Sequence, residues 1–83
     1  MKYIVINQHR FYPIPPEVSH ASFFKSVAAP GDVCTGAGFI FLQSDGEPVC
    51  YGRSESLGVD AQPARDTLLA EIAFSAARRR VAC

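Results

Sequence analysis

The stretch Lys2-Tyr3-Ile4-Val5-Ile6-Asn7 decides which fold we expect for this chain. Its four residues from Tyr3 to Ile6 are all β-branched or aromatic, and such side chains favour a strand. An unbroken apolar run, unlike an alternating one, is typical of a strand that is buried on both faces. The sequence therefore predicts a central strand over residues 2–7.

A helix is expected after a proline-rich segment. Three prolines within residues 8–16 indicate a loop or a ragged sheet edge. Pro16 and Ser19 both suit the first turn of a helix, which we expect to run from Pro16 or Ser19 to Ala28. The sequence Ala-Pro-Gly-Asp over residues 29–32 would end it. The apolar stripe of this helix is His20, Phe23, Phe24 and Val27.

A hairpin and a second helix are expected further along the chain. Asp45-Gly46 between apolar runs predicts a turn joining strands over residues 39–43 and 48–53, and a polar loop over 54–58. Small residues over 34–38 allow backbone to approach another group closely. The second helix should begin between Asp60 and Pro63 and continue to about Arg79, with residues 81–83 starting a short last strand. Its predicted inner stripe is Leu68 or Leu69, Ile72, Ala73 and Ala76.

The order strand–helix–strand–strand–helix predicts an α+β fold: a small mixed sheet with two packed helices. The 83 residues are too few for two hydrophobic cores, so we expect one domain over residues 1–83. A chain of this length buries only about 60% of its unfolded surface, so its stability margin is small. Both a monomer and a homodimer fit this expectation.

Composition and charge argue against several classes of partner. The 8 basic residues balance the 8 acidic ones, so nucleic acid is not indicated. No apolar run approaches the 18 to 20 or so residues of a membrane span, and the N-terminal region is too short for a secretory signal. We therefore expect a cytoplasmic protein with no cofactor. Its three cysteines should be free thiols: Cys34, Cys50 and Cys83. Their number is odd and none forms a C-x-x-C pair, which argues against a disulfide framework. Their spacing with His9 and His20 does not suit a zinc site.

Three segments carry groups that suit an anion. His20 lies near the expected start of a helix, Gly36-Ala37-Gly38 precedes a strand, and Ser54-Glu55-Ser56 follows one. Lys2 adds a positive charge, and histidine is the side chain that accepts a proton near neutral pH. Together these groups suit phosphate. Each also has a structural interpretation: a histidine on an apolar stripe, a bulge at the glycines, and ordinary turn serines.

Four segments, in the same order along the chain, resemble motifs of the Janus/Ocnus family, which includes a small phosphohistidine phosphatase. Residues 2–6 are similar to its lysine at the opening of a strand, and residues 20–27 to its His-Ala-x-Ile-Tyr-x-x-Val helix. Residues 34–38 are similar to its Cys-x-Gly-Gly-Gly loop, and residues 51–58 to its Tyr-Gly-Tyr-Ser-x-x-x-Gly turn. The resemblance covers about residues 2 to 75.

This resemblance implies a metal-independent protein histidine phosphatase whose partner is a phosphohistidine-bearing protein or a small phosphate anion. His20 would be the general base that activates water, and Arg10 would correspond to an arginine of the family. The residues implied to hold the phosphoryl oxygens, by side chain or by backbone, are Lys2, Gly36, Gly38, Arg53, Ser54, Glu55 and Ser56.

Two residues depart from the family's pattern and leave alternatives open. An inward Glu55 would repel phosphate, whereas with an outward Glu55 only the backbone of the turn would matter. Arg53 replaces a tyrosine and would either supply a cation or shield the rim of the site. The alternatives are therefore a module of the same fold that binds phosphate or a phosphoprotein without turnover, and an interaction domain without a pocket.

Overall fold

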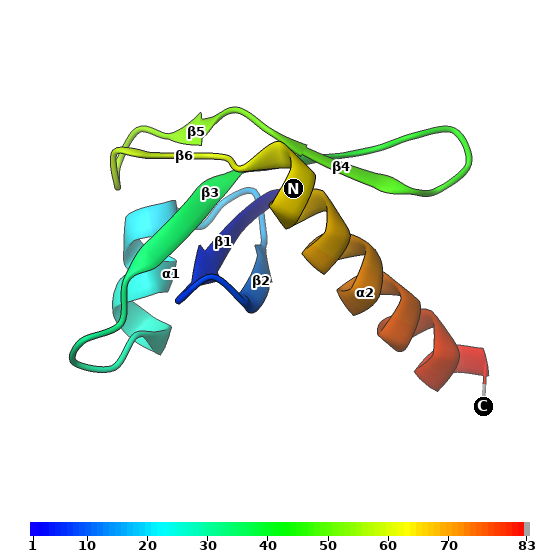
Figure 1. Ribbon diagram of the computed structural model, residues 1–83, viewed down its shortest axis with the longest axis horizontal. Helices are drawn as coiled ribbons and strands as arrows, with labels where there is room; N and C mark the ends of the chain where they lie inside the picture. Colours follow the sequence, from blue (N-terminus) through cyan, green and yellow to red (C-terminus); the bar gives the residue numbers. More distant parts are fainter. Residues whose placement is uncertain (83) are drawn as a thin grey trace.

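The computed structural model describes residues 1–82, with side chains described up to residue 76, and it has the predicted α+β architecture. Within these residues, a four-stranded sheet and a small two-stranded sheet are combined with two helices (Figure 1). The elements are β1 (Lys2–Ile6), β2 (Arg10–Ile14), α1 (His20–Val27), β3 (Cys34–Leu42), β4 (Pro48–Tyr51), β5 (Arg53–Ser54), β6 (Val59–Asp60) and α2 (Pro63–Ala82).

The larger sheet has the order β2-β1-β3-β4 and is antiparallel throughout, so the prediction of a mixed sheet was wrong. A short turn over residues 7–9 brings β2 back along β1, and α1 then returns the chain so that β3 also runs opposite to β1. The central position of β1 is confirmed. Its Tyr3 and Val5 pack on one face of the sheet and its Ile4 and Ile6 on the other, and all four are fully buried.

The proline-rich segment contains an edge strand, β2, where the sequence predicted a loop or a ragged edge. Pro13 lies opposite Tyr3 of β1. An edge strand tolerates proline because one side of its backbone needs no ladder hydrogen bond. The neighbouring Phe11 and Tyr12 pack against the two opposite faces of the sheet, as a strand requires. The prolines thus led the sequence analysis to predict a loop where an alternating edge strand is present.

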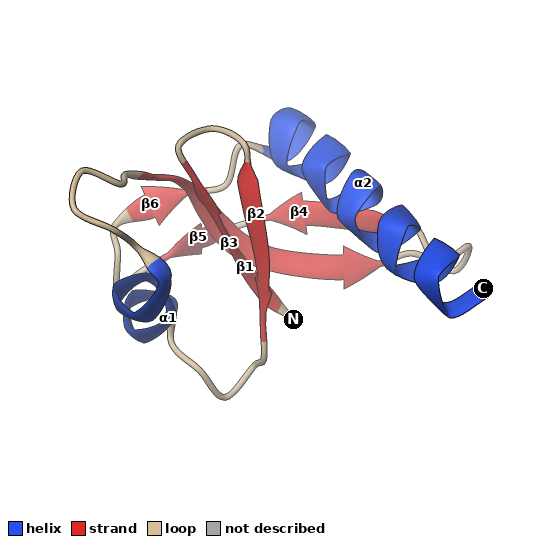
Figure 2. Ribbon diagram, turned by 90° about the horizontal axis from the view of Figure 1, so that it is seen from below, coloured by secondary structure: helices blue, strands red, loops and turns tan. Residues whose placement is uncertain are grey.

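The two helices cover opposite faces of the sheet (Figure 2). Helix α1 begins at His20, one residue after the N-cap Ser19, whose hydroxyl accepts a hydrogen bond from the Ser22 N–H at 3.1 Å. The later of its two predicted starts is therefore confirmed. On the opposite face, α2 packs through Ala70 against the core that contains Tyr3.

Helix α2 begins within the predicted interval, but its predicted inner stripe was partly wrong. Leu68 and Ile72 are 61% and 66% exposed, whereas Asp66 and Ala70 are fully buried and Leu69 is half-buried. A buried carboxylate that bonds to the sheet sets the rotation of this helix, and apolar spacing does not report such a bond. Residues 81 and 82 belong to α2 and do not start a strand, and Cys83 lies outside the described residues.

The predicted hairpin is present, with longer and interrupted strands. Gly46 has φ +85°, and the Gln43 N–H donates to the Glu47 carbonyl across the turn. Strand β3 begins at Cys34 and includes the glycine segment, which the sequence placed before the strand. Gly52, with φ +81°, ends β4, and the chain continues into the small β5–β6 sheet. The sequence did not predict this sheet, because it placed Arg53 in the second hairpin strand and residues 54–58 in a loop.

None of the described helices has both the length and the apolar character needed to cross a membrane.

Candidate anion-binding cleft

A cleft of about 520 Å³ opens where the start of β1, the start of α1 and the β5–β6 turn meet. It brings together five of the predicted site residues, which come from distant parts of the chain. The cleft is lined by Lys2, Ser19, His20, Phe39, Tyr51, Gly52, Arg53, Glu55 and Ser56.

The imidazole of His20 is 5% exposed and is held in one orientation. Its Nε2 lies 2.8 Å from the Gly38 carbonyl oxygen, and its ring meets the ring of Phe39 edge-on with centroids 5.8 Å apart. A carbonyl oxygen only accepts hydrogen bonds, so Nε2 must carry the proton. In the neutral ring Nδ1 then keeps its lone pair, and it has no hydrogen-bond partner among residues 1–76, whose side chains are described. Nδ1 is therefore the ring nitrogen left without a protein partner, on a residue that lines the cleft.

The two predicted glycines lie outside the cleft lining and have different surroundings. A Cβ on Gly38 would collide with the backbone carbonyl of Tyr51, so this position must be glycine for β3 and the end of β4 to approach each other. A Cβ on Gly36 would lie 2.6 Å from the side chains of Arg65 and Asp66. Close backbone approach thus occurs at both glycines, toward protein groups. Gly38 serves the cleft through the carbonyl that holds His20.

The Ser54 side chain organises the turn after β5 and does not line the cleft. It is fully buried, and its Oγ accepts a hydrogen bond from the Leu57 N–H at 3.1 Å. The Gly58 N–H donates to the Ser54 carbonyl at 2.9 Å, which closes one helical turn. Ser56 joins this turn to α1, because its Oγ accepts from the Ala21 N–H at 3.3 Å.

Backbone donors and one lysine supply hydrogen bonds for an anion. The first N–H groups of a helical turn have no partner within the turn. Those of Glu55 and Ser56 bond to no other described residue, and both residues line the cleft. The Lys2 Nζ donates to the Val18 carbonyl at 3.2 Å and has two further hydrogens. Donors of these kinds are the groups that bind small anions in proteins.

The side chain of Glu55 points outward, which settles the two alternatives for this residue. It is 86% exposed, and its Oε1 lies 3.9 Å from the Arg53 Nε. The same Nε lies 3.4 Å from the Asp60 Oδ1 across the small sheet. Arg53 is therefore at the cleft rim, half-exposed and flanked by two carboxylates.

Aromatic rings form one wall of the cleft, a feature that sequence reasoning missed. Phe39 and Tyr51 are paired across β3 and β4, with ring centroids 5.9 Å apart. A two-residue turn at Asp45-Gly46 would pair Phe39 with Gly52, so the predicted hairpin did not place Phe39 opposite Tyr51. Ser19, the helix cap, was considered for capping alone, although it also lines the cleft.

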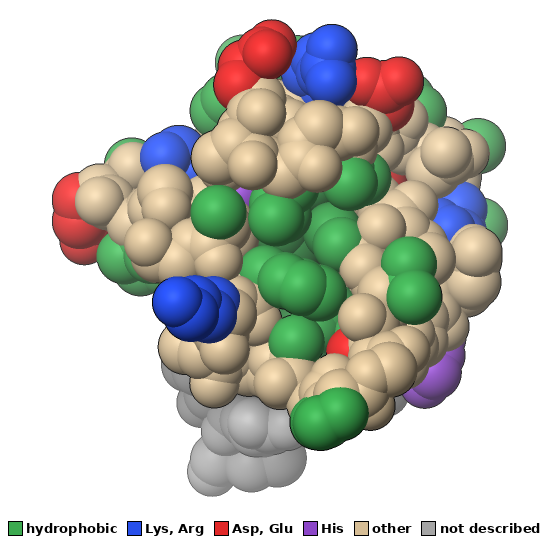
Figure 3. Space-filling view, turned by 90° about the vertical axis from the view of Figure 1, so that its left-hand side faces the viewer, with side chains coloured by type: hydrophobic (Ala, Val, Ile, Leu, Met, Phe, Trp, Pro, Cys, Tyr) green, Lys and Arg blue, Asp and Glu red, His purple; other side chains and the backbone are tan. Residues whose placement is uncertain are grey.

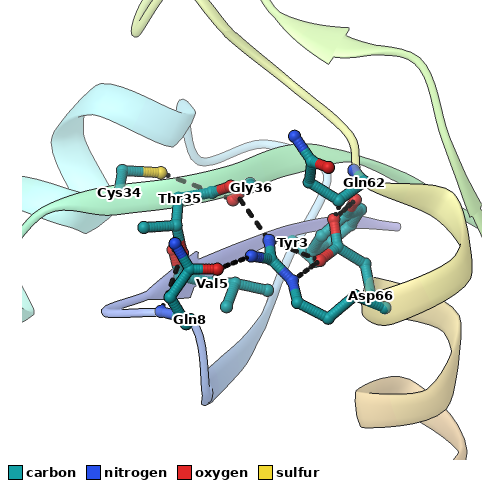
Figure 4. Close-up of polar contacts among 9 residues, drawn as sticks. Tyr3, Val5, Gln8, Cys34, Thr35, Gly36, Gln62 and Asp66 are labelled. Atoms are coloured by element: carbon teal, nitrogen blue, oxygen red, sulfur yellow. Dashed lines mark hydrogen bonds and ion pairs between the residues drawn. The ribbon is translucent and has the colours of Figure 1, made fainter.

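A buried polar network beside Gly36 anchors α2 to the sheet (Figure 4). The Tyr3 hydroxyl donates to the Asp66 carboxylate at 2.5 Å, and Arg65 bonds both to that carboxylate and to the Thr35 carbonyl. Burial, and then the bond to Asp66, raise the pKa of Tyr3 far above its usual value. None of these residues lines the cleft, so the network has a structural role.

Arg10 lies at the other end of β1 from Lys2 and does not line the cleft. Its guanidinium bonds to Asp32 at 2.6 Å, so its suggested correspondence to a family arginine has no support from position.

The cysteines are free thiols where the structure describes them, as expected. Cys34 is half-buried and Cys50 is fully buried. Burial raises the pKa of both thiols, that of Cys50 to about 11, so neither is an activated nucleophile. Cys83 lies outside the described residues. Among the described residues, no three His, Cys, Asp or Glu side chains form a metal-ligand cluster.

No protein-family model, curated protein or solved structure matches this chain. The similarity to the Janus/Ocnus family therefore rests on the four sequence motifs and stays a prediction.

Proposed function

We propose that this chain binds a phosphoryl group in the cleft and hydrolyses a phosphoramidate, with protein phosphohistidine as the leading substrate. The observation that carries the proposal is the position of His20. Its Nδ1 has no partner among residues 1–76, and His20 lines the same cleft as Glu55 and Ser56, whose N–H groups bond to no other described residue. A candidate base and an oxyanion cradle thus share one small cavity.

The reaction follows from these groups. Nδ1 of His20 takes a proton from a water molecule as the water oxygen forms a bond to phosphorus. The P–N bond breaks, and its electron pair stays on the leaving nitrogen, which takes up a proton from solvent. The N–H groups of Glu55 and Ser56 and the ammonium of Lys2 stabilise the charge on the phosphoryl oxygens. The products are inorganic phosphate and the free side chain.

The aromatic wall favours a planar group next to the phosphoryl group. Tyr51 is 50% exposed and pairs with Phe39 at the cleft, so the two rings present a flat apolar surface. Aromatic and heteroaromatic rings stack well on such a surface. The imidazole of phosphohistidine fits this wall better than the short chain of phosphoserine.

Binding without turnover is the second candidate, and a specific observation favours it. Arg53 is flanked by two carboxylates, and the Ser54 hydroxyl is used inside its own turn. These two groups therefore contribute less to charge stabilisation than the family pattern implies. A pocketless interaction domain receives the least support, because the cleft contains the chemical groups described above.

Hydrolysis of a phosphohistidine peptide tests the proposal. We expect His20→Gln to reduce kcat by about 100-fold to 10,000-fold, because the amide can still donate to the Gly38 carbonyl but cannot act as a base. His9→Gln is the matched control, since His9 lies in the exposed turn before β2 and does not line the cleft. Equal rates for the wild type and His20→Gln would rule out a general base at His20.

A titration with inorganic phosphate, followed by NMR, separates the two candidates from a chain without a site. Both candidates predict saturable shifts confined to the amides of Glu55 and Ser56 and to the His20 ring. Binding without hydrolysis of the peptide would identify the second candidate. No shift at millimolar phosphate would contradict both.

A further inference from the structure

We propose that the cleft selects phosphorylated segments with a lysine or arginine next to the phosphorylated residue, and that Glu55 and Asp60 provide this selectivity. The inference rests on the proposed function, because it concerns the peptide that delivers the phosphoryl group to the cleft. The inference starts from the carboxylates of Glu55 and Asp60, which have no role in the proposed reaction at His20.

The geometry of the rim places one cation between two anions. Arg53 of β5 is paired in register with Asp60 of β6, and Glu55 follows in the adjoining turn. The Arg53 Nε lies 3.4 Å from the Asp60 Oδ1 and 3.9 Å from the Glu55 Oε1. Figure 3 shows a basic side chain between acidic ones at the top of the molecule.

The rim therefore carries an excess of one negative charge beside a cradle that attracts anions. Glu55 and Asp60 are 86% and 74% exposed, so both carboxylates face whatever enters from solvent. A cation of the peptide that lies beside the phosphoryl group is attracted by these two carboxylates, whereas an acidic neighbour is repelled.

Because exposed charges interact only over short distances, the positive charge must come from residues next to the phosphorylated one in the peptide. Adjacent residues of an extended chain lie about 3.5 Å apart along its axis, and lysine and arginine side chains are longer than this spacing. Glu55 itself lines the cleft, so a cation one residue from the phosphorylated position reaches it. If the Arg53 guanidinium turns toward the phosphoryl group, both carboxylates become available to the cation of the peptide.

The test is the affinity of two peptides that differ only in their flanking charges. Each carries a non-hydrolysable phosphonate analogue of phosphohistidine, flanked on both sides by lysine in one peptide and by glutamate in the other. We expect the wild type to bind the lysine peptide at least about fivefold more tightly at low salt, by fluorescence anisotropy. The preference should weaken in high salt, because exposed charges are screened.

Two variants assign the preference to the rim. The double variant Glu55→Gln, Asp60→Asn should abolish or reverse the preference, since Lys2 and Arg53 then dominate the field at the cleft. Glu71→Gln is the matched control, because Glu71 lies on α2 and does not line the cleft. This variant should keep the wild-type preference.

The outcomes distinguish this inference from the proposed function. Equal affinity for the two phosphonate peptides, with both binding more tightly than their unmodified forms, would overturn the inference and leave the proposed function intact. A lysine preference that survives the double variant would also overturn the inference. If neither phosphonate peptide binds more tightly than its unmodified form, the proposed function fails, and the inference fails with it.

Discussion

At the residue scale, one hydrogen bond decides which nitrogen of His20 is available for chemistry. The Gly38 carbonyl holds Nε2, and only a glycine at that position lets β3 come close enough to Tyr51 to place the carbonyl there. The phosphate-binding potential of the turn arises in a similar way. The Ser54 hydroxyl bonds the Leu57 N–H, and the N–H groups of Glu55 and Ser56 stay unpaired among the described residues. Gly38 and Ser54, which do not line the cleft, thus help to position groups that do.

Substitution of the two glycines should separate stability from function. Gly38→Ala forces a methyl group against the Tyr51 carbonyl and displaces the partner of His20. We expect a loss of about 1–3 kcal/mol in the free energy of unfolding and weaker phosphate binding. Gly36→Ala meets the ends of the Arg65 and Asp66 side chains, so it should lower stability while the folded protein keeps its phosphate affinity.

Urea denaturation and phosphate titration by NMR measure the two effects. Normal phosphate affinity in folded Gly38→Ala would contradict the role given to its carbonyl. A loss of affinity in Gly36→Ala would place Gly36 functionally in the site.

At the element scale, the position of α2 depends on a buried acid more than on an apolar stripe. Asp66 is fully buried and accepts hydrogen bonds from Tyr3 of β1, from Arg65 and from the Gln62 N–H. A buried carboxylate is costly unless it is paired and hydrogen-bonded. The same network needs Gly36 on β3, because any side chain there would occupy the space of the two ionic groups.

Removing a member of this network should therefore destabilise the domain. Tyr3→Phe should lower the free energy of unfolding by about 1–2 kcal/mol, since the Asp66 carboxylate loses a buried donor. Tyr12→Phe is the matched control, because the Tyr12 hydroxyl bonds to no other described residue, and its effect should stay within about 0.5 kcal/mol. Asp66→Ala should cost about 3–5 kcal/mol because Arg65 loses its buried partner. Equal denaturation midpoints for Tyr3→Phe and Tyr12→Phe would show that the network contributes nothing.

At the scale of the whole molecule, the cleft and a second polar cluster lie at opposite ends of β1. The cleft contains Lys2, and the turn after Ile6 contains Asn7, whose amide donates to Asp32. Asp32 also accepts from Arg10 and from the Ala29 N–H, so it joins the β1–β2 hairpin to the loop before β3. The cluster thus closes the end of the molecule opposite the cleft.

Low pH should weaken the hydrogen bonds of this second cluster, because it protonates Asp32. The bonds from the Ala29 N–H, Arg10 and Asn7 lower the pKa of Asp32 to about 2, below the value of about 3.9 in an unfolded chain. The ionised form therefore stabilises the fold above about pH 4, and this contribution is lost as the pH falls through 2. We expect the Tm of the wild type to drop between pH 5 and pH 2 by more than that of Asp32→Asn.

Glu17→Gln is the control for this prediction, because Glu17 is exposed and has no interaction with another described residue. It should keep the wild-type pH dependence. Parallel curves for the wild type and Asp32→Asn would show that Asp32 contributes no stability that depends on pH.

Local signals were sufficient for most of the elements and for five of the eight predicted site residues. The apolar run at Tyr3, the Asp45-Gly46 turn and the Ser19 cap each lie within a few residues of the structure they specify. Of the predicted site residues, Lys2, His20, Arg53, Glu55 and Ser56 do line one cleft. Gly36, Gly38 and Ser54 contact protein groups instead. The sequence did not distinguish the two roles, because a glycine or a serine has the same local signature in either.

By itself, the sequence determined that this is an α+β domain with a doubly buried central strand, a hairpin and two helices, since each of these depends on local periodicity and turn chemistry. Only the tertiary structure decided that β2 is an edge strand, that α2 turns Asp66 inward and that Glu55 points outward. The physical reason is the same in all three cases. The outcome depends on a contact that forms only in the folded chain, namely with β1 for Pro13, with Tyr3 for Asp66, and through the β5–β6 pairing for Arg53 and Glu55.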